Sequence, residues 1–255
     1  MKALVLCAGY GTRLSDLTRD IPKAMLPLQG RPLLEYIISH LAQQGFTQIM
    51  VNLHFKPEQI RGYFKDGTRW GVKIHYSYEP ELLGTAGGLK KAASFLRQGD
   101  LFLAQYGDVL TDQNLKKMIE FHQTRCALAT LLVHKRARSN SVVSMDEAGR
   151  IVGFLERPTE QERSGVQSPW VNSGLCVCAP EFLDAIPDNI PSDIPRDILP
   201  RIISTGRLYG FPLSGYRCAI DSIERLAEAR TALAEGHCKL SLPANTKDNN
   251  AQSER

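Results

Sequence analysis

The residues near the N-terminus that are best suited to chemistry are two glycines followed by a hydroxyl and two cations. An apolar run at residues 3–7 leads into Ala8-Gly9-Tyr10-Gly11-Thr12-Arg13-Leu14, and Lys23 follows in Pro22-Lys23-Ala24-Met25-Leu26-Pro27. Two glycines after a buried strand allow a tight turn whose backbone N–H groups converge on an anion. Arg13 and Lys23 can supply positive charge where negative charge builds up in phosphoryl transfer. The pattern predicts a triphosphate site.

Two other phosphate-binding loops begin in a similar way, and the sequence argues against both. The dinucleotide fingerprint requires a third glycine where Leu14 stands, and the P-loop requires Gly-Lys followed by Ser or Thr about five residues on. Taken alone, Gly9 and Gly11 are equally compatible with an ordinary turn. The cations that follow them favour the triphosphate.

Two further segments have residue types that suit a nucleotide or a sugar. Leu83-Gly84-Thr85-Ala86-Gly87-Gly88 opens a helical segment, where small residues let a flat ligand approach the backbone and the helix N-terminus favours anions. Gly107-Asp108 follows an apolar run at 101–104, at the sheet edge where open α/β sheets bind ligands. A carboxylate there can hold Mg²⁺, which prefers oxygen ligands and bridges to phosphates. The alternatives are a glycine turn and a surface aspartate.

An α/β framework is expected to position these residues. Strand-length apolar runs at 3–7, 48–53, 72–76, 101–104 and 127–133 alternate with segments of helical period at 33–44, 57–64, 86–96 and 112–123. Asp112 is the expected N-cap of the last of these helices. The rhythm predicts an α/β, Rossmann-like fold with a mainly parallel or mixed central sheet and helices on both faces.

The second half of the chain has a different rhythm. Short strands are expected at 141–145, 151–154 and 171–178, joined by turn-rich segments, and a helix at 222–233 is expected to bury a face of Ile223, Leu226, Ala229 and Leu233. These strands are predicted to extend or flank the first sheet, so that residues 1–236 form one domain. The polar segment 237–255 is predicted to be disordered.

Composition excludes several classes of protein. The 255 residues have a formal net charge of +4 and include no long basic run, which argues against a nucleic-acid partner. The short run at 134–138 is expected to be a solvated loop, with phosphate contact as the alternative. No apolar stretch is long enough for a membrane span. The six cysteines are scattered, which favours reduced thiols and a cytoplasmic location, and Cys176 and Cys178 are expected to pack in the core.

At this point the sequence resembles a known family. Gly9-Tyr10-Gly11-Thr12-Arg13-Leu14 with Pro22-Lys23 is similar to the signature of the sugar-1-phosphate nucleotidyltransferases, or NDP-sugar pyrophosphorylases, and the likeness extends over about residues 2 to 233. The string Leu83-Gly84-Thr85-Ala86-Gly87 looks most like the mannose-1-phosphate and heptose-1-phosphate guanylyltransferases.

The resemblance implies roles for particular residues. It implies catalytic roles for Arg13 and Lys23, and nucleotide contacts at Leu6, Ala8, Gly9, Gly11, Thr12, Arg13, Gly84, Thr85 and Gly107. Phe154-Leu155-Glu156-Arg157-Pro158 resembles the family's Phe-x-Glu-Lys-Pro, and Asn172-Ser173-Gly174 its Asn-Ala/Ser-Gly segment. These matches imply a sugar-phosphate site of Gly87, Glu156, Arg157 and Asn172, in which a planar guanidinium replaces the usual lysine.

The C-terminal motif departs from the family. Where members have Gly-Tyr-Trp-x-Asp-Ile-Gly, this chain has Gly215-Tyr216-Arg217-Cys218-Ala219-Ile220-Asp221, so Ala219 stands at the place of the second metal-binding aspartate. The resemblance implies Asp108 as the first ligand of Mg²⁺. Residues two apart on a strand share a face, so Asp221 is the predicted second ligand. Its alternative role is the N-cap of the helix at 222–233.

The sequence therefore predicts an enzyme that uses Mg²⁺ to transfer a nucleoside monophosphate from an NTP to a sugar 1-phosphate. The resemblance divides the domain into a nucleotide-binding half, about 1–135, and a sugar-binding half, about 136–236. GTP with a mannose- or heptose-type 1-phosphate is preferred, and uridylyl or thymidylyl transfer is the alternative. A non-catalytic sugar-nucleotide sensor and an NAD-binding module are the rival readings. A homodimer is left open.

Overall fold

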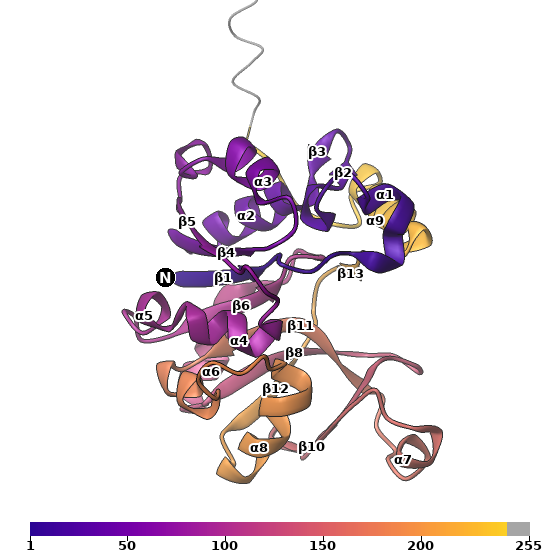
Figure 1. Cartoon of the computed structure of the whole chain (residues 1–255). Helices are drawn as coiled ribbons and strands as arrows, with labels where there is room; N and C mark the ends of the chain where they lie inside the picture. The colour runs from indigo at the N-terminus through magenta and orange to yellow at the C-terminus, as the bar shows by residue number, and fades with distance from the viewer. Residues whose placement is uncertain (244–255) are drawn as a thin grey trace, which may run out of the picture.

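The computed structural model describes residues 1–243, apart from the side chains of Arg13 and Ser15. Within this part of the chain, nine strands form one sheet whose main path runs β10-β9-β11-β6-β1-β4-β5, with β8 beside β11 and β12 beside β8. Figure 1 shows α2, α3 and α9 on one side of β1, and α4 and α8 on the other. The predicted α/β class, with a mostly parallel mixed sheet, is confirmed. None of the described helices is long and apolar enough to cross a bilayer.

The parallel half of the sheet comes from the first part of the chain. Its strands are β1 (Lys2–Leu6), β4 (Gln48–Leu53), β5 (Lys73–Tyr78) and β6 (Phe102–Tyr106). In register, Leu6 pairs with Asn52 on one side and with Tyr106 on the other. Because these strands end level, the loops that follow them open at the same edge, where parallel sheets bind ligands.

The helices of this half connect its strands. They are α1 (Ser15–Thr18), α2 (Leu33–Gln43), α3 (Pro57–Phe64), α4 (Gly84–Lys91) and α5 (Ala93–Leu96), with a small hairpin of β2 (Pro27–Leu28) and β3 (Arg31–Pro32). The helix expected over 86–96 begins two residues earlier and is interrupted at Ala92, which ends α4 and precedes α5.

The later strands extend the same sheet in mostly antiparallel fashion. They are β8 (Ala129–Lys135), β9 (Ser141–Met145), β10 (Ile151–Glu156), β11 (Trp170–Cys178) and β12 (Leu208–Pro212), accompanied by α6 (Leu115–Thr124), α7 (Glu160–Ser164) and α8 (Leu199–Ile202). β11 runs antiparallel to both β6 and β8, and joins the two halves. Cys176 and Cys178 are buried in it, as expected, and all six cysteines are free thiols.

Two apolar cores lie on opposite faces of the sheet. Successive side chains of β1 alternate between them, because side chains on a strand point to opposite faces. Ala3 and Val5 belong to a core shared with α2, α3, α6 and α9, whereas Leu4 belongs to a core shared with α4, α5 and α8.

A second, two-stranded sheet lies beside the main one. In it β13 (Arg217–Ala219) runs antiparallel to β7 (Val109–Thr111), with Ala219 opposite Val109. The helix after β13 is α9 (Ile223–Ala234), and its N-cap is Ser222, whose hydroxyl accepts the Arg225 N–H at 3.3 Å. The alternative role of Asp221 as this cap is therefore wrong. The expected apolar face is also partly wrong, since Ile223 is 61% exposed.

Asp112 is not the helix cap that the sequence predicts. α6 begins at Leu115, and its N-cap is Asn114, whose side chain accepts the Lys117 N–H at 3.2 Å. The Asp112 carboxylate accepts the Tyr216 N–H at 2.6 Å and the Lys239 N–H at 2.7 Å. It therefore ties β7 to two segments that are more than 100 residues away in sequence.

The end of the described chain is packed, contrary to the expectation of disorder from residue 237. Cys238 is buried in the core beside α9, and Leu240 and Leu242 pack against the same core. Gln43 of α2 donates to the Ser241 carbonyl at 2.9 Å. The prediction from sequence polarity was wrong for residues 237–243, because a few apolar side chains are enough to order a segment that packs against an existing core. The remainder of that expectation, 244–255, lies outside the described residues.

Candidate functional site

The glycine-rich turn after β1 is held against the Lys23 segment. Gly11 has a positive φ of +69°, and its carbonyl accepts the Leu14 N–H at 2.9 Å and the Thr18 hydroxyl at 3.0 Å. A Cβ at Gly11 would lie 3.1 Å from the Cβ of Lys23, so a side chain there would crowd the lysine as well as strain the backbone. The Arg13 side chain lies outside the described part, and its catalytic role stays a prediction.

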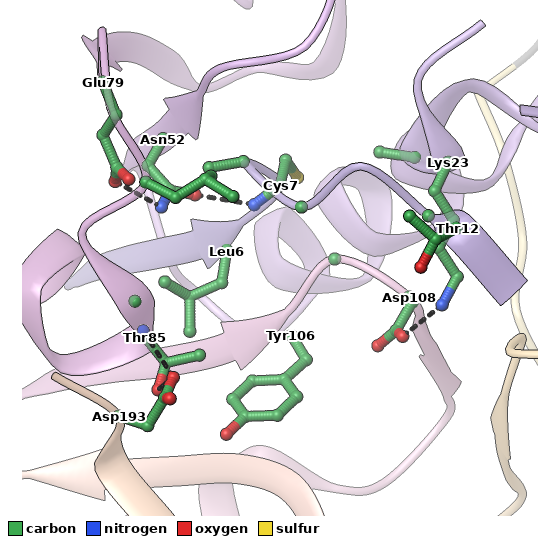
Figure 2. A pocket seen from close by; sticks show the side chains of 17 residues that line it. Leu6, Cys7, Thr12, Lys23, Asn52, Glu79, Thr85, Tyr106, Asp108 and Asp193 are labelled. Atoms are coloured by element: carbon green, nitrogen blue, oxygen red, sulfur yellow. Dashed lines mark hydrogen bonds and ion pairs between the residues drawn. The ribbon is translucent and has the colours of Figure 1, made fainter. Parts of the chain in front are cut away.

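The loops at the carboxyl edge of the sheet enclose a first cavity of about 350 Å³. Figure 2 shows it from close by, with Leu6 and Tyr106 on neighbouring strands and Lys23 facing Asp108. The structure brings together at this cavity all the described residues that the sequence predicts for the nucleotide, which are Leu6, Ala8, Gly9, Gly11, Thr12, Gly84, Thr85 and Gly107. We call it the nucleotide-side cavity.

Two buried polar residues of this cavity were missed by the sequence analysis. The side chain of Asn52 donates to Glu79 Oε1 at 2.8 Å and accepts the Cys7 N–H at 2.6 Å. Glu79 Oε2 accepts the Leu83 N–H at 3.1 Å, and this carboxylate is only 1% exposed. The network joins the ends of β1, β4 and β5 to the start of α4. The only sequence signal was polar residues at strand ends.

Lys23 and Asp108 form an ion pair at the floor of the site. The ammonium Nζ donates to Asp108 Oδ2 at 2.5 Å, and both side chains are mostly buried. Asp108 follows β6, whereas Lys23 belongs to the segment that Gly11 packs against. The predicted catalytic cation and the predicted metal ligand therefore meet in space.

A second, larger cavity of about 740 Å³ adjoins the first. Four residues line both cavities, which therefore share a wall: Thr85, Tyr106, Asp108 and Asp193. Three of the four residues predicted for the sugar phosphate line the second cavity, namely Glu156, Arg157 and Asn172. We call it the sugar-side cavity.

Local backbone features direct these side chains into the sugar-side cavity. The pairing of β11 with β8 shifts in register between Asn172 and Cys176, and such bulges re-aim side chains. Gly174 at φ +83° donates its N–H to Asn172 Oδ1 at 3.2 Å. The pKa of Glu156 is raised by burial, against the opposing effect of Arg157, whose Nε lies 3.9 Å from Glu156 Oε1.

Gly87 is the predicted sugar-site residue that the structure does not bring to a cavity wall. It lies inside α4, and its N–H donates to the Ser192 carbonyl at 3.2 Å. A Cβ there would lie 2.8 Å from the Cβ of Leu83. The small residue is needed because Leu83, at the start of α4, lies so close, which is a packing requirement that a motif match cannot distinguish from ligand contact.

Asp108 and Asp221 lie on adjacent segments of the small sheet. The Asp108 carbonyl accepts the Ile220 N–H at 2.8 Å, and both carboxylates line the sugar-side cavity together with Ala219. These oxygen donors suit Mg²⁺, which binds through one or two carboxylates and completes its shell with waters and phosphate oxygens. Among the described residues, no group of three or more His, Cys, Asp or Glu side chains could hold an ion by itself. The donor set therefore fits an ion that shares its coordination with a phosphate.

The sugar-side cavity is also lined by arginines that the motif search did not find. Besides Arg157, they are Arg136, Arg138, Arg196 and Arg217. The expectation of a solvated loop at 134–138 is only partly right, because His134 and Lys135 belong to β8, while Arg136 and Arg138 lie at the cavity. Arg196 is held by Asp193 at 3.1 Å and by Asp197 at 3.1 Å.

The sequence of this chain is similar to those of proteins that act on nucleotides and sugar phosphates. Residues 2–234 match the family described as Nucleotidyl transferase. The chain is 36% identical over 220 residues to a UTP--glucose-1-phosphate uridylyltransferase of Synechocystis, covering 81% of this chain and 56% of that protein. It is 33% identical over 222 residues to a mannose-1-phosphate guanylyltransferase of Mycobacterium tuberculosis, covering 84% and 59%.

The fold is shared with solved structures as well. HddC from Yersinia pseudotuberculosis superimposes with a TM-score of 0.77 at 23% identity, over 91% of this chain and 99% of that one. The chain spans between half and two thirds of the length of the two curated relatives that it matches. With the family match extending from β1 to the last residue of α9, the chain belongs to the nucleotidyl transferase family.

Proposed function

We propose that this protein transfers a nucleoside monophosphate from an NTP to a sugar 1-phosphate and releases pyrophosphate. The observation that carries the proposal is the pair of adjoining cavities that share Thr85, Tyr106, Asp108 and Asp193. One cavity is lined by the glycine-rich turn and the other by polar and charged side chains. Two phosphorylated substrates held in these cavities would meet at the common wall, beside Lys23.

The reaction is an in-line displacement at the α-phosphorus of the NTP. A phosphate oxygen of the sugar 1-phosphate forms the new P–O bond, and the bond to pyrophosphate breaks. Because the nucleophile is already an anion, no general base is needed, and catalysis reduces to positioning and neutralisation of charge. Lys23 supplies a cation at the meeting point, and Glu156 and Asn172 orient the sugar. Mg²⁺ held by Asp108 and Asp221 would add charge neutralisation at the phosphates.

Guanine is the base that we propose, and the chemistry of Glu79 at the nucleotide-side cavity supports it. Glu79 is an acceptor-only carboxylate, and guanine presents two adjacent donors, N1–H and N2–H, on its Watson–Crick edge. Uracil and thymine present one donor between two carbonyl oxygens, which a carboxylate repels. The guanylyltransferase relative supports GTP, and the uridylyltransferase relative keeps UTP as the second candidate. The sugar is proposed from the mannose- or heptose-type class.

The test is pyrophosphate release from each of four NTPs combined with a panel of sugar 1-phosphates. Lys23→Ala and Asp108→Ala should each lower kcat by at least about 100-fold, as removal of a transition-state charge contact does. Lys116→Ala, on the exposed face of α6, is the matched control and should retain full turnover. Undiminished turnover in both site variants would refute the proposal. Ligand-induced stabilisation without pyrophosphate release would instead support a sensor.

Two further parts of the proposal concern the setting of the enzyme. The six free thiols are compatible with a cytoplasmic location, where thiols stay reduced. A homodimer remains a prediction, which light scattering on the purified protein would check.

A further inference from the structure

We propose that the sugar-side cavity accepts a sugar 1-phosphate that carries a second anionic group, and that Arg217, Arg136 and Arg138 bind this group. The inference rests on the proposed function, because it specifies the substrate class of the same site. It goes beyond that function by assigning a role to three cations that neither the transfer reaction nor the signature motifs use.

Arg217 is built into the wall of the cavity. It lies on β13 opposite Thr111, and its Nε donates to the Ser173 carbonyl at 3.2 Å. Arg217 and Ala219 are two residues apart on this strand, and both line the sugar-side cavity. The hydrogen bond fixes one edge of the guanidinium, while its remaining N–H donors stay available to a ligand.

The residues of β13 set the charge of this part of the wall. Arg217 contributes a guanidinium and Ala219 only a methyl group to the strand that lines the cavity. This strand therefore adds a positive charge and no negative charge to the wall.

The cations required for one phosphate group are already present without these arginines. The proposed transfer assigns Lys23 and Arg157 to the reacting phosphates, and Arg196 is held by Asp193 and Asp197. Arg136 and Arg138 extend from the segment after β8 to the same cavity as Arg217. Five arginines therefore line the cavity together with the carboxylates of Asp108, Glu156, Asp193 and Asp221. Arg136, Arg138 and Arg217 are the three arginines to which the proposed transfer assigns no role.

The pKa of a neighbouring histidine, His134, reflects the positive charge of these arginines. His134 donates to or accepts from the Ser173 hydroxyl at 2.8 Å. Burial, and after it the positive charges of Arg217 and Arg136, together lower the pKa of His134 to about 4. Burial also lowers the pKa of Arg217, so its charged form lacks solvation that an anionic ligand would replace.

The shared chemistry of the ligand is an oxyanion, which guanidinium forks bind in bidentate fashion. A second phosphate and a sugar carboxylate both meet this description. Hexose 1,6-bisphosphates and hexuronic acid 1-phosphates therefore serve as the two anionic probes, each compared with the neutral parent hexose 1-phosphate in the glucose and mannose series.

The experiment measures kcat/KM for pyrophosphate release with each probe, using the preferred NTP. We expect the wild-type protein to favour at least one anionic probe over its neutral parent by about 10-fold or more, which corresponds to one charged hydrogen-bond pair. Arg217→Gln, and separately Arg136→Gln with Arg138→Gln, should reduce this ratio by about 10-fold. Arg207→Gln is the matched control, because this arginine lies at the other end of β8 and bonds to Cys126, and it should leave the ratio unchanged.

The outcomes separate this inference from the proposed function. A ratio near one in the wild-type protein, or equal losses for anionic and neutral sugars in Arg217→Gln, overturns the second anion site while turnover itself upholds the transferase. If no pyrophosphate is released with any pair, calorimetric binding of the same probes gives the ratio instead. Stronger binding of an anionic probe that depends on Arg217 then supports the anion site without the reaction.

Discussion

At the scale of single residues, Glu79 is the side chain that we propose selects the base of the nucleotide. Its carboxylate is buried, takes hydrogen bonds from Asn52 and Leu83, and lines the nucleotide-side cavity. We predict that Glu79→Gln lowers kcat/KM for GTP relative to UTP by at least about 10-fold, because an amide offers one acceptor and one donor where the carboxylate offers two acceptors. Competition between the two nucleotides in one assay measures the ratio, and equal losses for both would show that Glu79 is only structural.

Gly107 provides a second test of single-residue packing. A Cβ at this position would lie 2.5 Å from Cys7 Sγ and 2.8 Å from the Leu6 carbonyl. We predict that Gly107→Ala lowers the free energy of unfolding by about 1–3 kcal/mol, because the ends of β1 and β6 must separate to admit a methyl group. Urea unfolding measures the change. Gly9→Ala is the control, since a Cβ at Gly9 would meet no atom within 4 Å.

At the scale of elements, the packing of α6 on β8 predicts a pH dependence. His122 is 4% exposed, its ring bonds to the Thr130 hydroxyl at 3.0 Å, and burial lowers its pKa to about 4. Between about pH 6.5 and 4 the unfolded chain binds a proton that the folded protein does not, so stability rises with pH in this window and falls as the pH drops.

The size of this effect follows from the same pKa. One such histidine contributes a loss of about 2 kcal/mol between pH 7 and pH 5. We predict that His122→Gln reduces the pH dependence of the free energy of unfolding by about this amount, whatever its effect at pH 7. An unchanged slope between wild type and variant would mean that His122 is protonated in the folded state.

The same elements show what the sequence could and could not predict. Local patterns located β1, β4, α2 and α3 closely, because apolar period and turn residues lie within each segment. The cap at Asp112 was misassigned, since its real partners, Tyr216 and Lys239, are distant in the sequence. Arg196 and Arg217 of the sugar-side cavity were missed for the same reason, and phosphate contact by residues 134–138 was only the alternative to a solvated loop. The arginines come from separate segments, and only the sheet topology brings them to one wall.

At the scale of the whole molecule, the last described residues connect elements that are distant in the sequence. Residues 237–243 connect the core beside α9 to α2 and to β7 through Cys238, Ser241 and Lys239. We predict that a chain ending at residue 236 is less stable than a chain ending at residue 243, by about 2–4 kcal/mol. It loses buried apolar surface, and Asp112 loses its hydrogen bond from Lys239 while it keeps the one from Tyr216. Chemical denaturation of the two truncated proteins tests this, and equal midpoints would contradict it.

The ion pair between Lys23 and Asp108 has a consequence for the order in which ligands associate. An ammonium group and a divalent ion compete for the same carboxylate, so a metal ion that arrives alone must displace the lysine. Triphosphate oxygens offer Lys23 another anionic partner and so release Asp108. Metal and nucleotide should therefore bind with positive coupling, and by thermodynamic reciprocity each should tighten the other equally. In Lys23→Met the competition is gone, and calorimetry should find tighter binding of Mg²⁺ alone together with a weakened coupling.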